Sequence, residues 1–192
     1  CFFYDMDIEQ IRSALTSEIK TLPSAELDGN EIASVLIIIY GKNPFIIMTK
    51  KASNLKVHAG EIAFPGGKWC EKDQDLLETA IRETKEELCL DVSKENVVGQ
   101  LDNVITLNSK YKITPFIAIL DAVPSLAANS EVESILHIPL ESFLNTMGED
   151  NLPEHRSIME MYTFTFEKHH VWGASARMLK QINTMFSDKN ML

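Results

Sequence analysis

The sequence has few cysteines and no long uninterrupted hydrophobic segment. Its three cysteines, Cys1, Cys70 and Cys89, are scattered and odd in number, which suits neither a disulfide framework nor a zinc site. No apolar run reaches the roughly 18 residues that a membrane-spanning helix needs, and no signal peptide is evident. We therefore expect a protein of the reducing cytoplasm that has no membrane partner.

Basic residues are also in the minority, since 18 Lys and Arg stand against 28 Asp and Glu, for a formal net charge of −10. This charge disfavours nonspecific binding to nucleic acid or to an acidic membrane, because both are negatively charged. If the partner is a small polyanion, a metal ion or well-placed lysines must supply positive charge locally. The remaining composition, with 45% hydrophobic residues, is typical of a globular protein.

Hydrophobic periodicity predicts a mixture of helices and strands. A repeat of three to four residues predicts helices over 5–22, 76–90 and 172–186, and Pro139 opens a short helix through Leu144. Apolar or alternating runs predict strands, over 33–40, 45–49, 61–64, 97–108, 111–120, 134–138 and 161–166. This mixture indicates an α/β sandwich.

The length of 192 residues predicts a single domain over 1–192. We expect an N-terminal helix and loop at 1–30, a core at 31–186 and a tail at 187–192. The strand 33–40 is almost wholly apolar, which is typical of a strand buried on both faces.

The predicted helix 76–90 carries three acids in one row. Glu83, Glu86 and Glu87 lie at i, i+3 and i+4, apart from the apolar face of the helix. Three carboxylates in a row repel one another, and a hard divalent cation with oxygen ligands would relieve that repulsion. Charged rows on helices are more often solvated faces, and Lys85 lies between these acids. The row alone therefore leaves both interpretations open.

Residues around the row favour a ligand site. Gly66 and Gly67 precede the helix, and glycine lets a backbone approach a ligand closely. Arg82 is spaced to pair with Glu78 or Glu86 and so to hold an acid in one rotamer. A glycine pair, an arginine and the acidic row together indicate a site for a metal or a phosphate.

This stretch resembles the Nudix box. The matching positions are Gly67, Arg82, Glu83, Glu86, Glu87 and Leu90. The loop is one residue longer than in the standard box, so the acidic position falls near Asp73, with Gln74 at the strict spacing from Arg82. The resemblance implies a Nudix-type α/β/α sandwich with a mixed central sheet.

Two further positions depart from the box. Thr84 stands where the box has an apolar residue, and Cys89 replaces its second glycine. A left-handed cap at a non-glycine residue costs about 1 kcal/mol, so Cys89 favours a helix that runs on past this point. Neither position belongs to the carboxylate row.

Segments outside the box are similar to one branch of the superfamily, the coenzyme A pyrophosphatases. The similar segments are Met48–Ala52 with Lys56, Gly60 and Phe64–Gly67, and then Ile113–Phe116, Glu131–Val132, Ile138–Leu140 and Val171–Ala174. That branch carries arginines where Lys51 and Lys56 stand. Lysine keeps the positive charge but lacks the fork that grips two phosphate oxygens.

The resemblance implies a hydrolase that depends on Mg²⁺ or Mn²⁺ and cleaves the diphosphate linkage of a nucleoside-diphosphate derivative, here coenzyme A or a related species. The expected metal ligands are Glu83, Glu86, Glu87 and the carbonyl of Gly67. The expected catalytic residues are Arg82 with Glu87 or Glu131, one of which accepts the proton of the attacking water. The expected substrate-binding residues are Lys51, Lys56, Gly66 and Gly67.

Two alternatives stay open at this point. The substrate could instead be ADP-ribose, another nucleotide sugar or a dinucleotide polyphosphate. The chain could also be a silent module that binds a nucleotide without cleaving it, although such a module need not keep Arg82 and the three glutamates. The expected partner is a small nucleotide, with no nucleic acid and no membrane, and a homodimer is left open.

Overall fold

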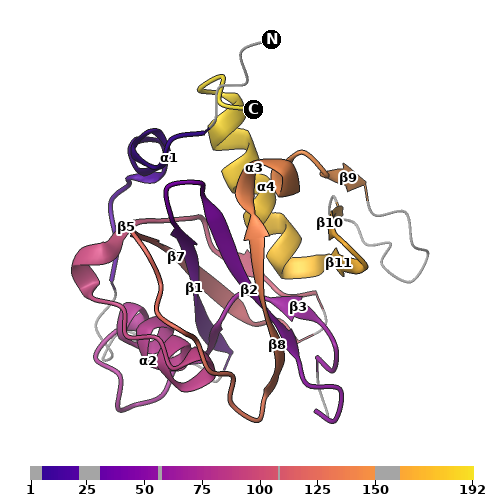
Figure 1. The fold of residues 1–192 in the computed structure, drawn as a ribbon. Helices are drawn as coiled ribbons and strands as arrows, with labels where there is room; N and C mark the ends of the chain where they lie inside the picture. The colour runs from indigo at the N-terminus through magenta and orange to yellow at the C-terminus, as the bar shows by residue number, and fades with distance from the viewer. Residues whose placement is uncertain (1–5, 22–30, 56–57, 108, 150–160) are drawn as a thin grey trace.

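A mixed eight-stranded sheet forms the centre of the molecule (Figure 1) in a computed structural model that describes residues 6–21, 31–55, 58–107, 109–149 and 161–192. The main path of the sheet is β3 (Ile62–Ala63), β2 (Phe45–Lys51), β1 (Ile32–Tyr40), β7 (Lys112–Leu120) and β5 (Val97–Gln100). Off this path, β4 (Gly66–Lys68) pairs with β1, β6 (Val104–Ile105) with β7, and β8 (Val132–Pro139) with β2. Strands β1 and β7 are parallel, whereas the other pairs described in this sheet are antiparallel.

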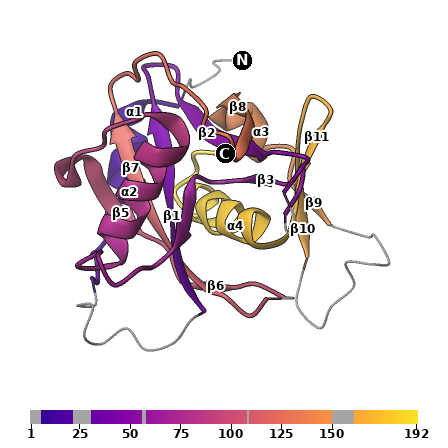
Figure 2. The ribbon, with the colours of Figure 1, turned by 90° about the horizontal axis from the view of Figure 1, so that it is seen from below.

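Helices cover both faces of this sheet. They are α1 (Ile8–Leu15), α2 (Leu76–Leu88), α3 (Leu140–Leu144) and α4 (Gly173–Ser187), with a 3-10 helix η2 (Lys94–Asn96). A second sheet holds β9 (Gly148–Glu149), β10 (Tyr162–Phe166) and β11 (His169–Val171). Figure 2 shows α2 and α4 on opposite sides of β1. The predicted α/β/α sandwich with a mixed central sheet is confirmed.

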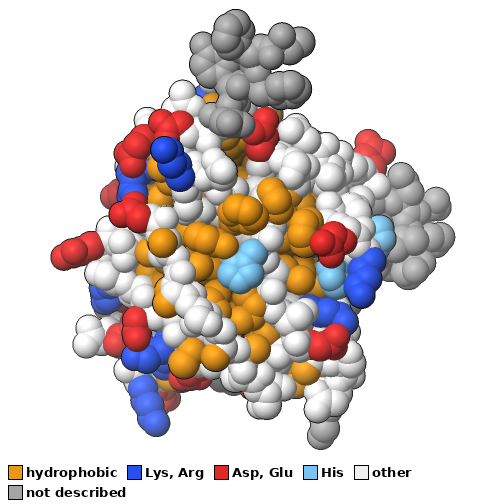
Figure 3. Space-filling view, in the orientation of Figure 1, with side chains coloured by type: hydrophobic (Ala, Val, Ile, Leu, Met, Phe, Trp, Pro, Cys, Tyr) orange, Lys and Arg blue, Asp and Glu red, His pale blue; other side chains and the backbone are white. Residues whose placement is uncertain are grey.

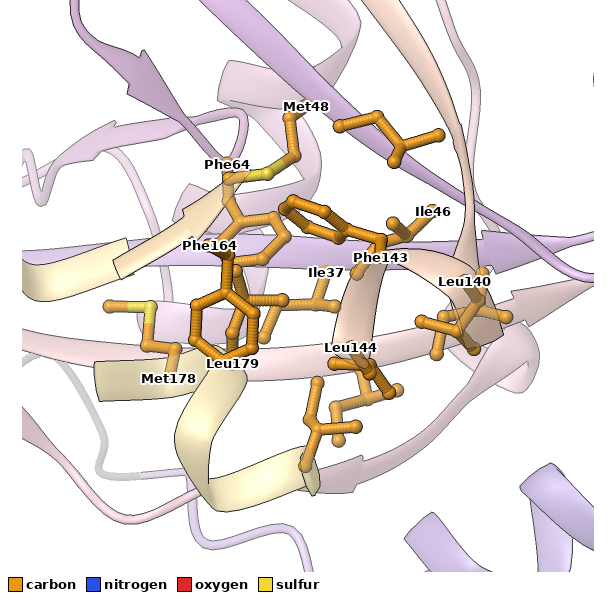
Figure 4. Packing of buried hydrophobic residues seen from close by; sticks show 14 of the residues in the cluster. Ile37, Ile46, Met48, Phe64, Leu140, Phe143, Leu144, Phe164, Met178 and Leu179 are labelled. Carbon is orange, nitrogen blue, oxygen red and sulfur yellow. The ribbon is translucent and has the colours of Figure 1, made fainter. Parts of the chain in front are cut away.

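Two hydrophobic clusters lie against the two faces of β1, because successive strand residues point to opposite faces. Ile37 and Ile39 belong to the cluster that includes Leu179 of α4. Figure 4 shows Phe143 and Phe164 in this cluster, with ring centroids 5.7 Å apart. Leu36, Ile38 and Ala80 of α2 belong to the other cluster. The prediction that this strand is buried on both faces is confirmed.

The first helix is shorter than predicted. It begins after the N-cap Asp7 and ends at Leu15, not at residue 22. Beyond Thr16 the chain lies along the edge of β5, where the Ser17 amide donates to the Val98 carbonyl over 3.1 Å. A Cβ on Gly99 would lie 2.1 Å from the Leu15 carbonyl oxygen, so this crossing requires glycine. Hydrogen bonds to the sheet edge thus replace the last helical turns.

The strand predicted over 97–108 is two strands, β5 and β6. Both pair with β7, and Pro115 lies between the paired segments. Its carbonyl accepts from the Leu101 amide over 3.0 Å, but proline has no N–H to donate back. The ladder is therefore interrupted at this point.

Strand β4 was not predicted, because a glycine pair suggests a loop. Gly66 and Gly67 pair with Val35 and Ser34 along the same edge of β1 that pairs further on with β2. A Cβ on Gly66 would lie 2.3 Å from the Ser34 carbonyl oxygen. The absence of a side chain thus permits the close approach that makes this strand. The short strands β9 and β11 were also missed.

Hydrophobic side chains gather near the middle of the face shown in Figure 3, and most charged side chains lie toward its margins. On the sheet, Tyr40 stacks on Phe45 with ring centroids 5.8 Å apart, and its hydroxyl is hydrogen-bonded to His137 Nδ1 over 2.7 Å. Within the described parts of the chain, no helix is both long and apolar enough to cross a membrane.

Candidate active site

Arg82 on α2 is held by a buried carboxylate in the loop before the helix. Its Nε and one terminal nitrogen donate to the two oxygens of Asp73, each over 2.9 Å. The Asp73 side chain is only 3% exposed and also accepts from Thr79 Oγ1 over 2.8 Å and from Cys70 Sγ over 3.4 Å. Burial by itself would raise the pKa of Asp73, but the hydrogen bonds from Arg82 and Thr79 outweigh it and lower that pKa.

Asp73, and not Gln74, is therefore the residue of the longer loop that binds Arg82. Gln74 instead donates its backbone N–H to Glu78 Oε2 over 2.7 Å. A terminal nitrogen of Arg82 also donates to Glu86 Oε1 over 3.2 Å, which is one of the two pairings predicted for this arginine. The alternative pairing with Glu78 does not form among the contacts described for these residues.

Helix α2 begins where the sequence suggests and ends earlier. Asp75 is its N-cap, whose side chain accepts from the Glu78 amide over 2.7 Å. Thr84 is buried and donates to the Ala80 carbonyl over 2.8 Å, so the hydroxyl at this apolar position is satisfied within the helix. The expectation that the helix runs past Cys89 was wrong, because Cys89 is a left-handed C-cap with φ 57° and ψ 31°.

The loop before β8 explains this early end. The amides of Ala127 and Asn129 donate to the carbonyls of Leu88 and Glu87 over 3.0 and 3.1 Å. These carbonyls belong to the last turn of α2, where no intrahelical partner remains. A tertiary contact thus takes the place of another helical turn, and the left-handed residue redirects the chain.

The three glutamates of the row differ in their surroundings. The Glu83 carboxylate lies directly against β4, since a Cβ on Gly67 would be 2.5 Å from its Cδ. It accepts from Arg82 over 2.7 Å. Glu86 is the outer member, with a side chain that is 56% exposed. Gly67 is therefore needed as a glycine because Glu83 occupies the space of its side chain.

Glu87 is the buried member of the row. Its side chain is 3% exposed, and its Oε1 accepts from Lys51 Nζ over 2.5 Å. Its Oε2 is buried and has no hydrogen-bond partner within the part of the chain that the structure describes. Burial raises the pKa of Glu87 more than the charge of Lys51 lowers it, and the negative charges of Glu83 and Glu131 raise it further.

Glu131 is brought to this place by backbone contacts. Its carbonyl accepts from the Ala52 amide over 2.9 Å, just beyond Lys51, and its own amide donates to Asn129 Oδ1 over 2.9 Å. The side chain is exposed, and its charge acts on Glu87. No spacing in the sequence indicates this contact, because it depends on the loop that covers the end of α2.

The structure thus brings together most of the predicted site residues, from the ends of β2 and β4, from α2 and from the loop before β8. They are Lys51, Gly66, Gly67, Arg82, Glu83, Glu86, Glu87 and Glu131. Lys56 lies outside the described residues. The roles assigned to these residues stay predictions.

The donors fit a hard divalent cation, which prefers carboxylate and carbonyl oxygens. Glu87 offers a buried oxygen that has no hydrogen-bond partner among the described residues, and Gly67 has no side chain between its backbone and the Glu83 carboxylate. Within the described ranges, no three acidic, histidine or cysteine side chains are already gathered as a metal site. Arg82 and Lys51 hold these carboxylates instead.

Comparison with known proteins identifies relatives over most of the chain. The NUDIX domain model matches residues 31–160. The Nudix hydrolase NudL of Yersinia pestis (strain Pestoides F), itself described as uncharacterized, is 34% identical over 157 residues, which are 80% of this chain and 78% of that protein. NudL of Yersinia pseudotuberculosis (serotype O:1b, strain IP 31758) is similar to the same extent.

Solved structures share the fold at low sequence identity. A MutT/nudix family protein from Enterococcus faecalis has a TM-score of 0.60 at 12% identity, covering 90% of this chain and 66% of that one. The MutT protein from Methanosarcina mazei Go1 has a TM-score of 0.54 at 18% identity, covering 87% of this chain and 100% of that one. Taken with the domain match and the 34% identical relatives, these findings show that the chain belongs to the Nudix hydrolase family.

Proposed function

We propose that this Nudix hydrolase cleaves the diphosphate linkage of coenzyme A or a related CoA species and uses Mg²⁺ or Mn²⁺. The observation that carries the proposal is the meeting of the carboxylate row of α2 with Gly67, Lys51 and Glu131. Carboxylates that could bind a cation, a lysine that could bind a phosphate and an exposed carboxylate that could accept a proton thereby lie in one place.

The metal ligands in this proposal are Glu83, Glu86, Glu87 and the Gly67 carbonyl. When bound, the divalent cation supplies neutralisation of phosphate oxygens and an acidified water for in-line attack on phosphorus. Arg82 acts as a positioning residue, because it contacts both Glu83 and Glu86 while Asp73 fixes its guanidinium. Rigid support of this kind limits the geometries that the row can adopt.

Glu131 is the carboxylate to which we assign the proton of the attacking water. Its side chain is exposed, so water reaches it, and it lies close enough for its charge to act on Glu87. Glu87 is a weaker candidate because it is buried and already paired with Lys51. General bases must reach the water directly or through one intervening water molecule.

Coenzyme A as substrate is supported by the similarity of Met48–Ala52 and Phe64–Gly67 to the coenzyme A branch. Coenzyme A carries a 3′-phosphate that ADP-ribose lacks, so its recognition needs an additional cationic contact. Lys51 lies against the carboxylate row, and for this reason we assign it to the diphosphate shared by both substrates. Lys56 is then the candidate for the 3′-phosphate among the two predicted lysines.

A substrate panel tests this proposal. Coenzyme A, its dephospho form, ADP-ribose and a diadenosine polyphosphate are incubated with Mg²⁺, and the products are identified by mass spectrometry. We expect 4′-phosphopantetheine and adenosine 3′,5′-bisphosphate from coenzyme A. A preference for ADP-ribose would replace coenzyme A as the substrate, and the absence of turnover on all four would favour a binding module.

A pair of variants tests the carboxylate row in the same assay. Glu87→Gln removes a charge with little change of shape, and its turnover should fall at least about a hundredfold. Glu95→Gln, at an exposed position of η2, is the matched control and should keep the wild-type rate. A wild-type rate in Glu87→Gln would remove the row from the chemistry.

A further inference from the structure

The two lysines that end β2 make different ion pairs. Strand neighbours face opposite ways, and the register between β2 and β8 shifts between Lys50 and Lys51. Lys50 Nζ donates to Glu133, whose side chain is 40% exposed. Lys51 is 15% exposed and donates to Glu87, which is 3% exposed. Of these two, it is Lys51 that carries its charge into the interior.

The partner of Lys51 is incompletely neutralised. Glu87 has the charges of Glu83 and Glu131 nearby. The ammonium group contacts its Oε1, while Oε2 stays buried and finds no hydrogen-bond partner among the residues described. A buried carboxylate is costly unless it is paired and its oxygens are satisfied. Lys51 therefore neutralises the negative charge around Glu87 only in part, and a divalent ion would neutralise it more fully.

We infer that Lys51 is an internal cation that occupies Glu87 in the metal-free protein and leaves it when a divalent metal binds there. The inference rests on the metal site of the proposed function. Two cations on one buried carboxylate repel each other strongly at low dielectric, so the ammonium group and the metal compete. The flexible four-carbon stem of lysine lets the charge move without any shift of the backbone.

This exchange would link metal binding to substrate binding. While Lys51 is paired with Glu87, its charge is not available to a phosphate. Displacement by the metal releases the ammonium group at the edge of the same site, where the diphosphate would lie. The exchange also keeps the buried Glu87 paired with a cation at every stage, which avoids an unpaired buried charge.

Metal binding to variants provides the first test. Lys51→Met keeps the length of the side chain and removes its charge, and Lys50→Met is the matched control at the neighbouring position. Mn²⁺ alone is titrated by calorimetry at about pH 8, where protons compete little for a carboxylate. We expect Lys51→Met to bind Mn²⁺ at least about tenfold more tightly than wild type, and Lys50→Met to stay within about twofold of it.

Thermal unfolding of the same proteins provides a second readout that does not depend on the calorimetric Mn²⁺ titration. Without metal, Lys51→Met should unfold at least about 5 °C below wild type, because Glu87 loses its partner. Addition of Mn²⁺ should raise the Tm of Lys51→Met more than that of wild type. The two effects have opposite signs, whereas a merely structural role of Lys51 would lower stability with and without metal alike.

A labelling experiment on the wild-type protein covers the case in which Lys51→Met does not fold. An amine-acylating reagent is applied with and without Mg²⁺, and labelling at Lys51 and at Lys50 is separated by peptide mass spectrometry. Labelling at Lys51 should rise at least about threefold with Mg²⁺, because the ammonium group leaves its buried partner, while labelling at Lys50 stays constant. Unchanged labelling at Lys51 would overturn the inference.

The outcomes also separate the inference from the function on which it rests. If Glu87→Gln loses Mn²⁺ binding but Lys51→Met binds no more tightly than wild type, the metal site stands and the competing lysine is refuted. If Glu87→Gln binds Mn²⁺ as wild type does, both the proposed metal site and the inference are overturned.

Discussion

Removing the charge of Asp73 should destabilise the protein although Asp73 lies outside the carboxylate row. In Asp73→Asn, one side-chain oxygen becomes an amide group that donates instead of accepting. The side chain accepts two hydrogen bonds from Arg82 and further ones from Thr79 and Cys70. The variant therefore breaks a bidentate ion pair and turns an amide N–H toward the guanidinium.

The size of the effect follows from the burial of the two partners. Breaking a fully buried ion pair by removing one partner costs about 3–5 kcal/mol. The Asp73 side chain is 3% exposed but that of Arg82 is 29% exposed, so water compensates part of the loss. We expect a loss of about 2–3 kcal/mol, which lowers the Tm of a protein of this size by about 4–12 °C.

The assay measures the Tm by thermal unfolding, monitored by circular dichroism, at several pH values. The pKa of Asp73 is lowered in the folded state, so its stabilising effect is present above the unfolded value of 3.8 and is lost as the pH falls through the lower folded value. The Tm difference between wild type and Asp73→Asn should therefore be constant near neutral pH and shrink below about pH 4.

A matched control separates the anchor from the outer contact of the same arginine. Glu86→Gln weakens the 3.2 Å contact between Arg82 and Glu86, a side chain that is 56% exposed, and should cost less than about 0.5 kcal/mol. A Tm of Asp73→Asn within 1–2 °C of wild type, roughly the shift expected for about 0.5 kcal/mol, would refute the reasoning. So would a difference that grows as the pH falls.

Three further predictions concern single positions. Glu131→Gln should lower kcat by about 10²–10⁴-fold without changing the dependence on Mg²⁺ concentration, and an unchanged kcat would return the proton-accepting role to Glu87. Cys89→Gly should raise Tm by about 2–4 °C in calorimetry, since it relieves a left-handed residue, and a lower Tm would contradict this. Gly67→Ala should displace the Glu83 carboxylate and lower turnover at least about tenfold while costing about 1–3 kcal/mol of stability, whereas wild-type turnover would show that the carboxylate is free to move.

The sequence predicts the parts of the fold that depend on local pattern. Strand β1 and the start of α2 follow from an apolar run and from an N-cap with helical periodicity, and both are found. The row of Glu83, Glu86 and Glu87 follows from helical spacing alone. These features are predictable because neighbours in the chain determine them.

The features that sequence reasoning missed depend on contacts between distant segments. Cys89 ends α2 because the loop before β8 satisfies the carbonyls of Glu87 and Leu88, and no property of cysteine indicates this. Strand β4 forms because Gly66 permits close approach to β1 and Gly67 leaves room for the Glu83 carboxylate, although glycine disfavours strands in general. The burial of Glu87 and its pairing with Lys51 likewise appear only when the sheet is assembled.

The division of one edge of β1 between β4 and β2 has a consequence for insertions. Ala33–Val35 pair with β4 and Ile38–Tyr40 pair with β2, so the backbone sets the spacing between Gly67 and the end of β2. Side chains alternate along a strand, and a slip of one residue exchanges its two faces. An insertion that moved Lys68 into the position of Gly67 would turn Gly67 away from α2 and direct the lysine side chain at Glu83. The register of this three-residue strand, rather than its composition, thus decides whether the carboxylate row faces a glycine or a lysine.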